Sequence, residues 1–155
     1  MQIKQRIVDA TSEGNLLAHG LNPLLARLYA ARGVKNKDEL EISLSGIIPP
    51  EQLTNNSRMA ALLADAISEN KKILIIGDYD ADGATATTVA MKGLKQMGAQ
   101  VDFLVPNRFE YGYGLTPEIV QLASTLHPDI LITVDNGIAS VDGVAAANRK
   151  GLLVL

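Results

Sequence analysis

Cysteine is absent from this 155-residue sequence, which excludes disulfide bonds and thiolate metal sites. No apolar run approaches the 18 residues of a membrane-spanning helix, and the first residues lack the apolar centre of a secretory signal. Glycine-rich dinucleotide fingerprints and Gly-Lys-Ser/Thr phosphate loops are also missing. The net charge of −3 gives no overall attraction to nucleic acid or to an anionic membrane. We therefore expect a cytoplasmic protein without membrane contact, in which any nucleic-acid binding depends on a local basic surface or on metal ions.

Hydrophobic residues make up 47% of the chain, which is ample for a packed core. Residues 1–15 show no strong period, but leucines at helical spacing follow, and Asn36 with Glu39 has the pattern of a capping box that opens a short helix through Ile42. The sequence therefore predicts an N-terminal helical region over residues 1–55. Residues 56–155 are predicted to be the first part of an α/β domain, opening with a helix over residues 56–70.

Strand and helix patterns alternate after residue 70. The predicted strands cover residues 72–77, 101–105, 129–134 and 152–155, and the predicted helices cover 84–97, 116–126 and 139–149. Residues 106–114 are predicted to be a loop. Such alternation is typical of a doubly wound, mainly parallel sheet. Because the sequence stops inside the last predicted strand, we expect it to be part of a longer protein.

Three carboxylates alternate in residues 77–83, GDYDADG, directly after an apolar run that predicts a buried strand. Two like charges ~5 Å apart repel by ~3 kcal/mol at an effective dielectric near 20. A cluster of Asp78, Asp80 and Asp82 is therefore easier to explain as a divalent-cation site than as packing, and hard oxygen ligands suit Mg²⁺ or Mn²⁺. Acids at a helix start can also act as caps, which we expect of one of the three.

Asp135 follows another predicted strand in the same way that Asp78 follows the first. Ligands of open parallel sheets bind beyond the carboxyl ends of the strands, so we expect Asp135 to face the same crevice as the first acidic cluster. The sequence therefore predicts one metal site from two distant segments. The simpler interpretation of residues 135–137, DNG, is a common Asn-Gly turn.

The loop at residues 106–114 should overhang this crevice. Arg108 has the fork geometry to clamp a phosphate, and Tyr111 or Tyr113 could stack on a base. The alternative is a surface loop whose aromatic rings pack on the edge of the sheet.

Taken together, residues 77–85, 105–115 and 133–138 resemble the single-stranded-DNA-specific exonucleases of the Asp-His-His (DHH) phosphoesterase superfamily, and the resemblance begins near residue 21. It implies a DHH-type α/β domain and 5′-to-3′ hydrolysis of phosphodiester bonds in single-stranded DNA during recombination and repair, with Mn²⁺ or Mg²⁺. The catalytic metal ligands that it implies are Asp80, Asp82 and Asp135, with Asp78 beside them as a further ligand or a support. The substrate contacts that we expect are Asn107, Arg108, Tyr113 and Asn136.

The resemblance also implies that residues beyond Leu155, the Asp-His-His motif among them, complete a two-metal site. The 155 residues alone are then expected to have little or no nuclease activity. The implied partners are single-stranded DNA, a single-strand-binding protein and a helicase. We expect the protein to be a monomer. Two alternatives stay open: a DHH phosphoesterase for short oligonucleotides, cyclic dinucleotides or pyrophosphate, and a non-catalytic binding module of the same fold.

Overall fold

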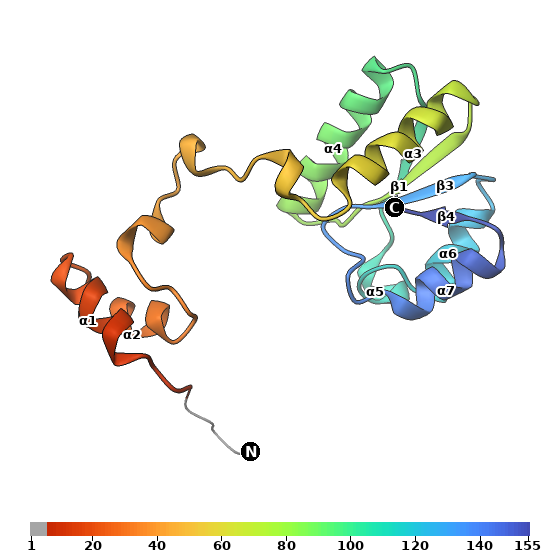
Figure 1. Ribbon diagram of the computed structural model, residues 1–155. Helices are drawn as coiled ribbons and strands as arrows, with labels where there is room; N and C mark the ends of the chain where they lie inside the picture. The colour runs from red at the N-terminus through yellow and green to blue at the C-terminus, as the bar shows by residue number, and fades with distance from the viewer. Residues whose placement is uncertain (1–5) are drawn as a thin grey trace. The chain divides into compact units, whose positions relative to one another are not determined.

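The computed structural model describes residues 6–155 (Figure 1). The chain divides into two compact units, the first ending at Leu53 and the second beginning at Thr54. Each unit has a hydrophobic core of its own. Among the described helices, none combines the length and the apolar character needed to cross a bilayer.

The first unit consists of two α-helices followed by short turns of 3₁₀-helix. The helices are α1 (Ala10–Ala18) and α2 (Pro23–Ala30), and the 3₁₀ turns are η1 (Lys37–Leu40), η2 (Leu44–Gly46) and η3 (Pro50–Gln52). No helical period precedes residue 16 in the sequence, yet α1 begins at Ala10 because the Asp9 side chain accepts a hydrogen bond from the Ser12 amide and starts the helix. Residues 1–5 of that stretch lie outside the described residues.

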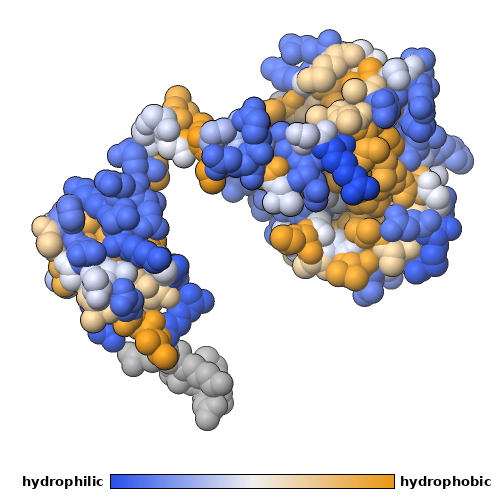
Figure 2. Space-filling view, in the orientation of Figure 1, coloured by the Kyte–Doolittle hydropathy of each residue, from blue (hydrophilic) through white to orange (hydrophobic). Residues whose placement is uncertain are grey.

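The capping box predicted at Asn36 is confirmed. The Glu39 amide donates to the Asn36 side chain at 3.3 Å, and the Asn36 amide donates to the Glu39 carboxylate at 3.2 Å. The element that it opens is shorter than expected, since η1 ends at Leu40 and not at Ile42. Beyond η1, the segment that leads to the second unit leaves large hydrophobic side chains exposed (Figure 2). None of these belongs to a described hydrophobic cluster: Ile42, Leu44, Ile47, Ile48 and Leu53.

The second unit is a four-stranded sheet in which every described pairing is parallel, in the order β2-β1-β3-β4. Its strands are β1 (Lys72–Ile76), β2 (Gln100–Leu104), β3 (Ile130–Thr133) and β4 (Leu153–Val154). Its helices are α3 (Asn56–Ser68), α4 (Ala81–Gln96), α5 (Arg108–Tyr111), α6 (Pro117–Ser124) and α7 (Val141–Arg149). The predicted fold class, α/β with a mainly parallel sheet, is confirmed.

Strand β1 lies in the interior of the sheet, and both of its faces are covered. Ile73 and Ile75 pack in a cluster with α3 and α4, whereas Leu74 and Ile76 pack in a second cluster with α6 and α7. Successive side chains of a strand point to opposite faces, so an unbroken apolar run is what a doubly covered strand needs. Figure 1 shows the two layers, with α3 and α4 on one side of the sheet and α5, α6 and α7 on the other.

The register of the sheet brings three chain segments to one edge. Ile76, the last residue of β1, pairs with Leu104 of β2 and with Thr133 of β3. Because the strands are parallel, the segments that follow all three strands leave the sheet at the same end. These segments hold the acidic motif, the loop at residues 106–114 and Asp135.

Candidate metal centre

Two glycines let the acidic motif fold tightly against its neighbours. A Cβ added to Gly77 would lie 2.3 Å from the Thr87 hydroxyl oxygen, and one added to Gly83 would lie 2.5 Å from the Asp78 carbonyl oxygen. Non-bonded atoms do not approach so closely. The glycines at the two ends of GDYDADG therefore allow the first turns of α4 to pack directly on the end of β1.

Asp80 is the residue that caps α4. Its carboxylate accepts a hydrogen bond from the Gly83 amide at 3.0 Å, so α4 begins at Ala81, three residues before the predicted start. This bond, together with the nearby Arg108 guanidinium, lowers the pKa of Asp80 below its ordinary value. The capping role expected of one acid in the motif thus falls to Asp80, which still presents a charged carboxylate at neutral pH.

Asp78 is buried, and its charge is balanced by Arg108. The Arg108 Nε donates to Asp78 Oδ1 at 3.2 Å, and a second guanidinium nitrogen donates to Oδ2. The Tyr79 amide also donates to Oδ1, at 2.8 Å. The carboxylate of Asp78 is therefore held in one orientation by three donors.

Arg108 was predicted to be a phosphate clamp, and the structure places its guanidinium on the acids. Besides its two bonds to Asp78, it contacts Asp80 at 3.2 Å. The guanidinium also lies over two aromatic rings, 4.5 Å from the centroid of Tyr79 and 5.1 Å from that of Tyr113. Such cation–π contacts restrict a long side chain. Tyr79 was not among the residues predicted to form the site, although it lies within the acidic motif.

The segment at residues 106–114, predicted to be a loop, contains the short helix α5. Asn107 caps it by accepting a hydrogen bond from the Phe109 amide at 3.0 Å. The side-chain oxygen of Asn107 is therefore engaged in starting the turn that carries Arg108, and the predicted substrate contact of Asn107 stays a prediction. A four-residue helix has no helical period to detect, which is why the sequence did not show it.

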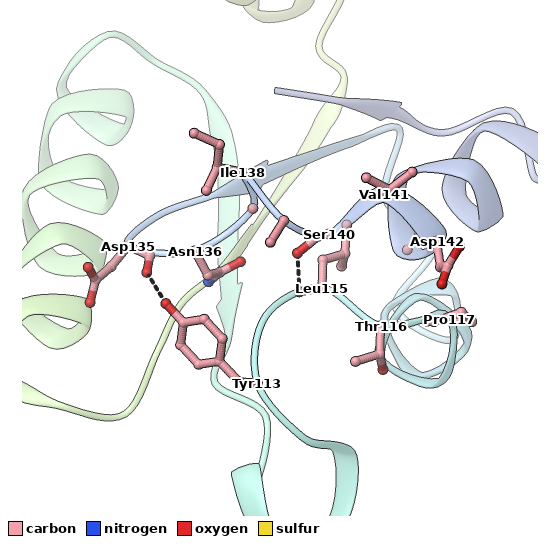
Figure 3. A pocket seen from close by; sticks show the side chains of 13 residues that line it. Tyr113, Leu115, Thr116, Pro117, Asp135, Asn136, Ile138, Ser140, Val141 and Asp142 are labelled. Atoms are coloured by element: carbon pink, nitrogen blue, oxygen red, sulfur yellow. Dashed lines mark hydrogen bonds between the residues drawn. The ribbon is translucent and has the colours of Figure 1, made fainter. Parts of the chain in front are cut away.

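Asp135 adopts a left-handed backbone conformation, with φ of 59°. The Tyr113 hydroxyl donates to its backbone carbonyl at 2.9 Å, as Figure 3 shows. Partial desolvation and the negative charge of Asp80 raise the pKa of Asp135 above its ordinary value. A cation bound beside a carboxylate that has like charges around it stabilises the charged form of that carboxylate.

Asp78, Asp80 and Asp135 each offer a carboxylate oxygen, and the three oxygens lie within 4.8 Å of one another. This spacing is close enough for a single cation to contact all three. The convergence of the two distant acidic segments, predicted from the sequence, is thus present in the structure. Asp82 lies in the exposed first turn of α4 and is not part of this described group, so its role as a metal ligand stays a prediction.

Asn136 connects the ends of two strands. Its side-chain nitrogen donates to the Ile76 carbonyl at 3.3 Å and to the Val134 carbonyl at 2.9 Å. Its side-chain oxygen is buried and has no hydrogen-bond partner in residues 6–155. The residue also lines a pocket of about 490 Å³ beside Asp135, drawn in Figure 3. On another wall of the pocket, the Ser140 hydroxyl accepts a hydrogen bond from the Leu115 amide at 3.0 Å. No sequence motif indicated a role for Ser140.

The comparison with known families agrees with this geometry. The model described as "DHH family, N-terminal domain" matches residues 72–155, which is more than half of the chain. The chain therefore belongs to the DHH family.

The relatives are more specific. The chain is 43% identical to the single-stranded-DNA-specific exonuclease RecJ of Escherichia coli K12, over all of this chain and 26% of that protein. A crystal structure of exonuclease RecJ bound to manganese matches with a TM-score of 0.61 and 34% identity, over 70% of this chain and 28% of the other. RecJ from Thermus thermophilus in complex with Mn²⁺ matches with a TM-score of 0.59 and 27% identity, over 97% of this chain and 21% of the other. The chain spans about a quarter of the length of the E. coli relative.

Proposed function

We propose that this chain forms the first part of the active site of a metal-dependent exonuclease that hydrolyses phosphodiester bonds of single-stranded DNA. The observation that carries the proposal is the convergence of Asp78, Asp80 and Asp135 at the carboxyl edge of a parallel sheet. The relatives named as single-stranded-DNA-specific exonucleases, and the solved RecJ structures with manganese, support the reaction and the metal.

The donor set suits Mn²⁺ or Mg²⁺. All three side chains offer hard carboxylate oxygens, and the chain has no cysteine that would favour a softer metal. Divalent ions in such a site lower the pKa of a bound water and stabilise charge on a phosphate.

The residues of this chain set the geometry for that chemistry. The N-terminus of α4 fixes Asp80, Arg108 fixes Asp78, and Tyr113 holds the backbone of Asp135. Asp80 and Asp135 keep carboxylate oxygens available to a cation, while Arg108 lowers the cost of gathering the negative charges. The same guanidinium stands beside the acids, where a phosphate that approaches the metal would meet a positive charge. We infer that Asp80 and Asp135 are direct ligands and that Asp78 acts through its pairing with Arg108.

Metal binding by the 155-residue chain is the direct test. We expect Mn²⁺, titrated while free Mn²⁺ is followed by electron paramagnetic resonance, to bind the wild-type chain and to bind Asp80→Asn and Asp135→Asn at least tenfold more weakly. Asp65→Asn is the matched control, because Asp65 is an exposed carboxylate on α3 outside the acidic group. Equal Mn²⁺ affinity in all four proteins would contradict the proposal.

Nuclease activity is a separate question. His19 and His127 are the two histidines of the sequence, so it contains no Asp-His-His motif. We accordingly expect the 155-residue chain to digest little or no single-stranded DNA. A single-strand-binding protein and a helicase as partners, and 5′-to-3′ polarity, stay predictions that rest on the family resemblance. A monomeric state also stays a prediction, as does the cytoplasmic location expected from the composition of the sequence.

A further inference from the structure

We propose that a groove between α4 and the edge strand β2 binds bases of single-stranded DNA next to the acidic group. The groove has a volume of about 460 Å³. This inference rests on the proposed function, because it takes single-stranded DNA as the substrate, and it adds a binding surface outside the metal centre.

The groove has one helical wall and one strand wall. The helical wall is a stripe of α4 that includes Thr88, Met91 and Lys95, and the opposite wall is Phe103 with Val105. The lining residues of the helical wall run from Ala84 to Lys95, and at 1.5 Å per residue this span is ~16 Å long. Since phosphates of one strand are ~3.4 Å apart in a stacked duplex, the groove is longer than a single nucleotide.

The strand wall presents aromatic surface to solvent. Phe103 pairs in register with Ile75, which is fully buried, yet Phe103 is 50% exposed. Helix α4 thus covers β1 and leaves the outer half of this sheet face open at β2. Tyr79, which also lines the groove, is 53% exposed. Exposed aromatic rings are the surfaces on which bases of single-stranded nucleic acid stack, without regard to sequence.

The charges around the groove suit a polyanion. Lys92 and Lys95 are exposed on its helical wall, and neither forms a salt bridge within the described part of the chain. The single acid among the lining residues, Asp78, is already paired with Arg108. An apolar peptide would pack on Phe103 and Val105, but it would make no favourable contact with the ammonium groups of Lys92 and Lys95. Bases in the groove with phosphates along its lysine rim use both features.

The groove is continuous with the metal centre. Asp78 and Tyr79 line the groove, Asp78 also belongs to the acidic group, and Tyr79 packs on Arg108. A strand whose phosphate lies at the acids would therefore have this surface beside it for neighbouring nucleotides.

The charge part of the proposal is tested by the salt dependence of binding. The 155-residue chain is titrated against fluorescein-labelled oligothymidylate in EDTA, which removes metal-mediated contacts. For single strands, log Kobs falls with log salt by ~0.7 for each neutralised phosphate, so Lys92→Gln with Lys95→Gln should reduce the slope by ~1.4. Arg149→Gln with Lys150→Gln makes the same charge change at the end of α7, on the other side of the sheet, and should leave the slope unchanged.

The stacking part is tested by photocrosslinking and by substitution. An oligonucleotide with 5-iodouracil should form cross-links at Phe103 or Tyr79, located by mass spectrometry. Phe103→Ala should weaken binding about fivefold or more, and Phe103→Leu, which keeps apolar bulk without a ring, should weaken it too. Phe103 is half exposed, so both variants should fold, which circular dichroism checks.

Equal salt slopes for the two double variants, or cross-links confined to residues 106–114, would overturn the proposal. A protein segment would then be the better candidate for the occupant of the groove. This result is distinguishable from failure of the proposed function. A chain that binds Mn²⁺ through Asp80 and Asp135 but forms no cross-link in the groove refutes the groove alone, whereas absence of Mn²⁺ binding refutes the metal centre.

Discussion

Arg108 donates two hydrogen bonds to Asp78, one to each oxygen of a carboxylate that is buried at the end of β1. The two residues are 30 positions apart in the chain. A buried carboxylate without a partner is strongly unfavourable, so the ion pair with Arg108 offsets much of the cost of burying Asp78. The pair also joins the short helix α5 to the start of the acidic motif and thereby shapes the metal centre.

Replacement of Arg108 should destabilise the chain in a graded way. Arg108→Lys keeps the charge but loses the planar fork, and Arg108→Gln loses both. We expect the free energy of unfolding, measured with urea in EDTA, to decrease in the order wild type, Arg108→Lys, Arg108→Gln. Adding Asp78→Asn to Arg108→Gln removes the unpaired charge and should restore part of the loss. Strict additivity of the two substitutions would contradict the pairing.

Much of the metal centre could be predicted from the sequence, for a physical reason. The carboxyl ends of parallel strands meet at one edge, so acids that follow two such strands converge even when 50 or more residues separate them. Asp78, Asp80 and Asp135 obey this rule. The rule uses only the strand pattern and the positions of the acids, and both can be recognised in a single sequence.

The contacts of Arg108 could not be predicted in the same way. Its orientation depends on α5, on the rings of Tyr79 and Tyr113, and on the burial of Asp78, all of which are tertiary features. For the same reason the sequence could not separate Asp82, in the first helical turn, from the acids that the fold brings together. The helical region predicted over residues 1–55 includes α1, but the start of α1 could not be located, because it depends on a cap at Asp9 and not on an apolar stripe.

The pH dependence of stability without metal should reflect Asp135. The pKa of Asp135 is raised in the folded state, so the protonated side chain favours folding. This stabilisation is fully present below the ordinary pKa of 3.8 and is lost as the pH rises through the pKa of the folded state. Asp80 has the opposite sign, because its lowered pKa stabilises the fold above pH 3.8 and the effect is lost at lower pH. In EDTA at pH 7, Asp135→Asn should therefore raise the unfolding midpoint, and asparagine also tolerates the left-handed backbone at this position. A lower midpoint at pH 7 would contradict this account.

Manganese should reverse that result. Mn²⁺ at 100 times its dissociation constant stabilises a folded protein by ~2.7 kcal/mol if it does not bind the unfolded chain. We expect this gain for the wild type at pH 7 and its loss in Asp135→Asn, so that the variant is the more stable protein in EDTA and the less stable one in Mn²⁺. Thermal unfolding of both proteins in both buffers tests this reversal in their order of stability. Asp82→Asn in the same assay decides whether Asp82 is a ligand, because the stabilisation by Mn²⁺ should be lost only if the replaced residue binds the metal.

The glycines of the acidic motif offer a test of the packing that builds the site. Gly77→Ala brings a methyl group against the Thr87 hydroxyl, and we expect a loss of ~1–3 kcal/mol in the free energy of unfolding. Gly93→Ala is the control: no atom outside its own helix lies near its added Cβ, so in the middle of α4 it should stabilise by ~0.5–1 kcal/mol.

A second substitution separates this contact from a general intolerance of side chains at Gly77. The Thr87 hydroxyl is buried and has no hydrogen-bond partner within residues 6–155, so Thr87→Ala removes a poorly satisfied group together with a methyl group. With the hydroxyl gone, the nearest Thr87 atom to the new methyl group is its Cβ, at 3.6 Å, which is ordinary van der Waals contact. The double variant Gly77→Ala with Thr87→Ala should therefore be more stable than the sum of the single effects by ~1 kcal/mol, within the range of coupling between residues in contact. If urea unfolding shows the two effects to be additive, the close approach of α4 to the end of β1 does not explain why glycine stands at position 77.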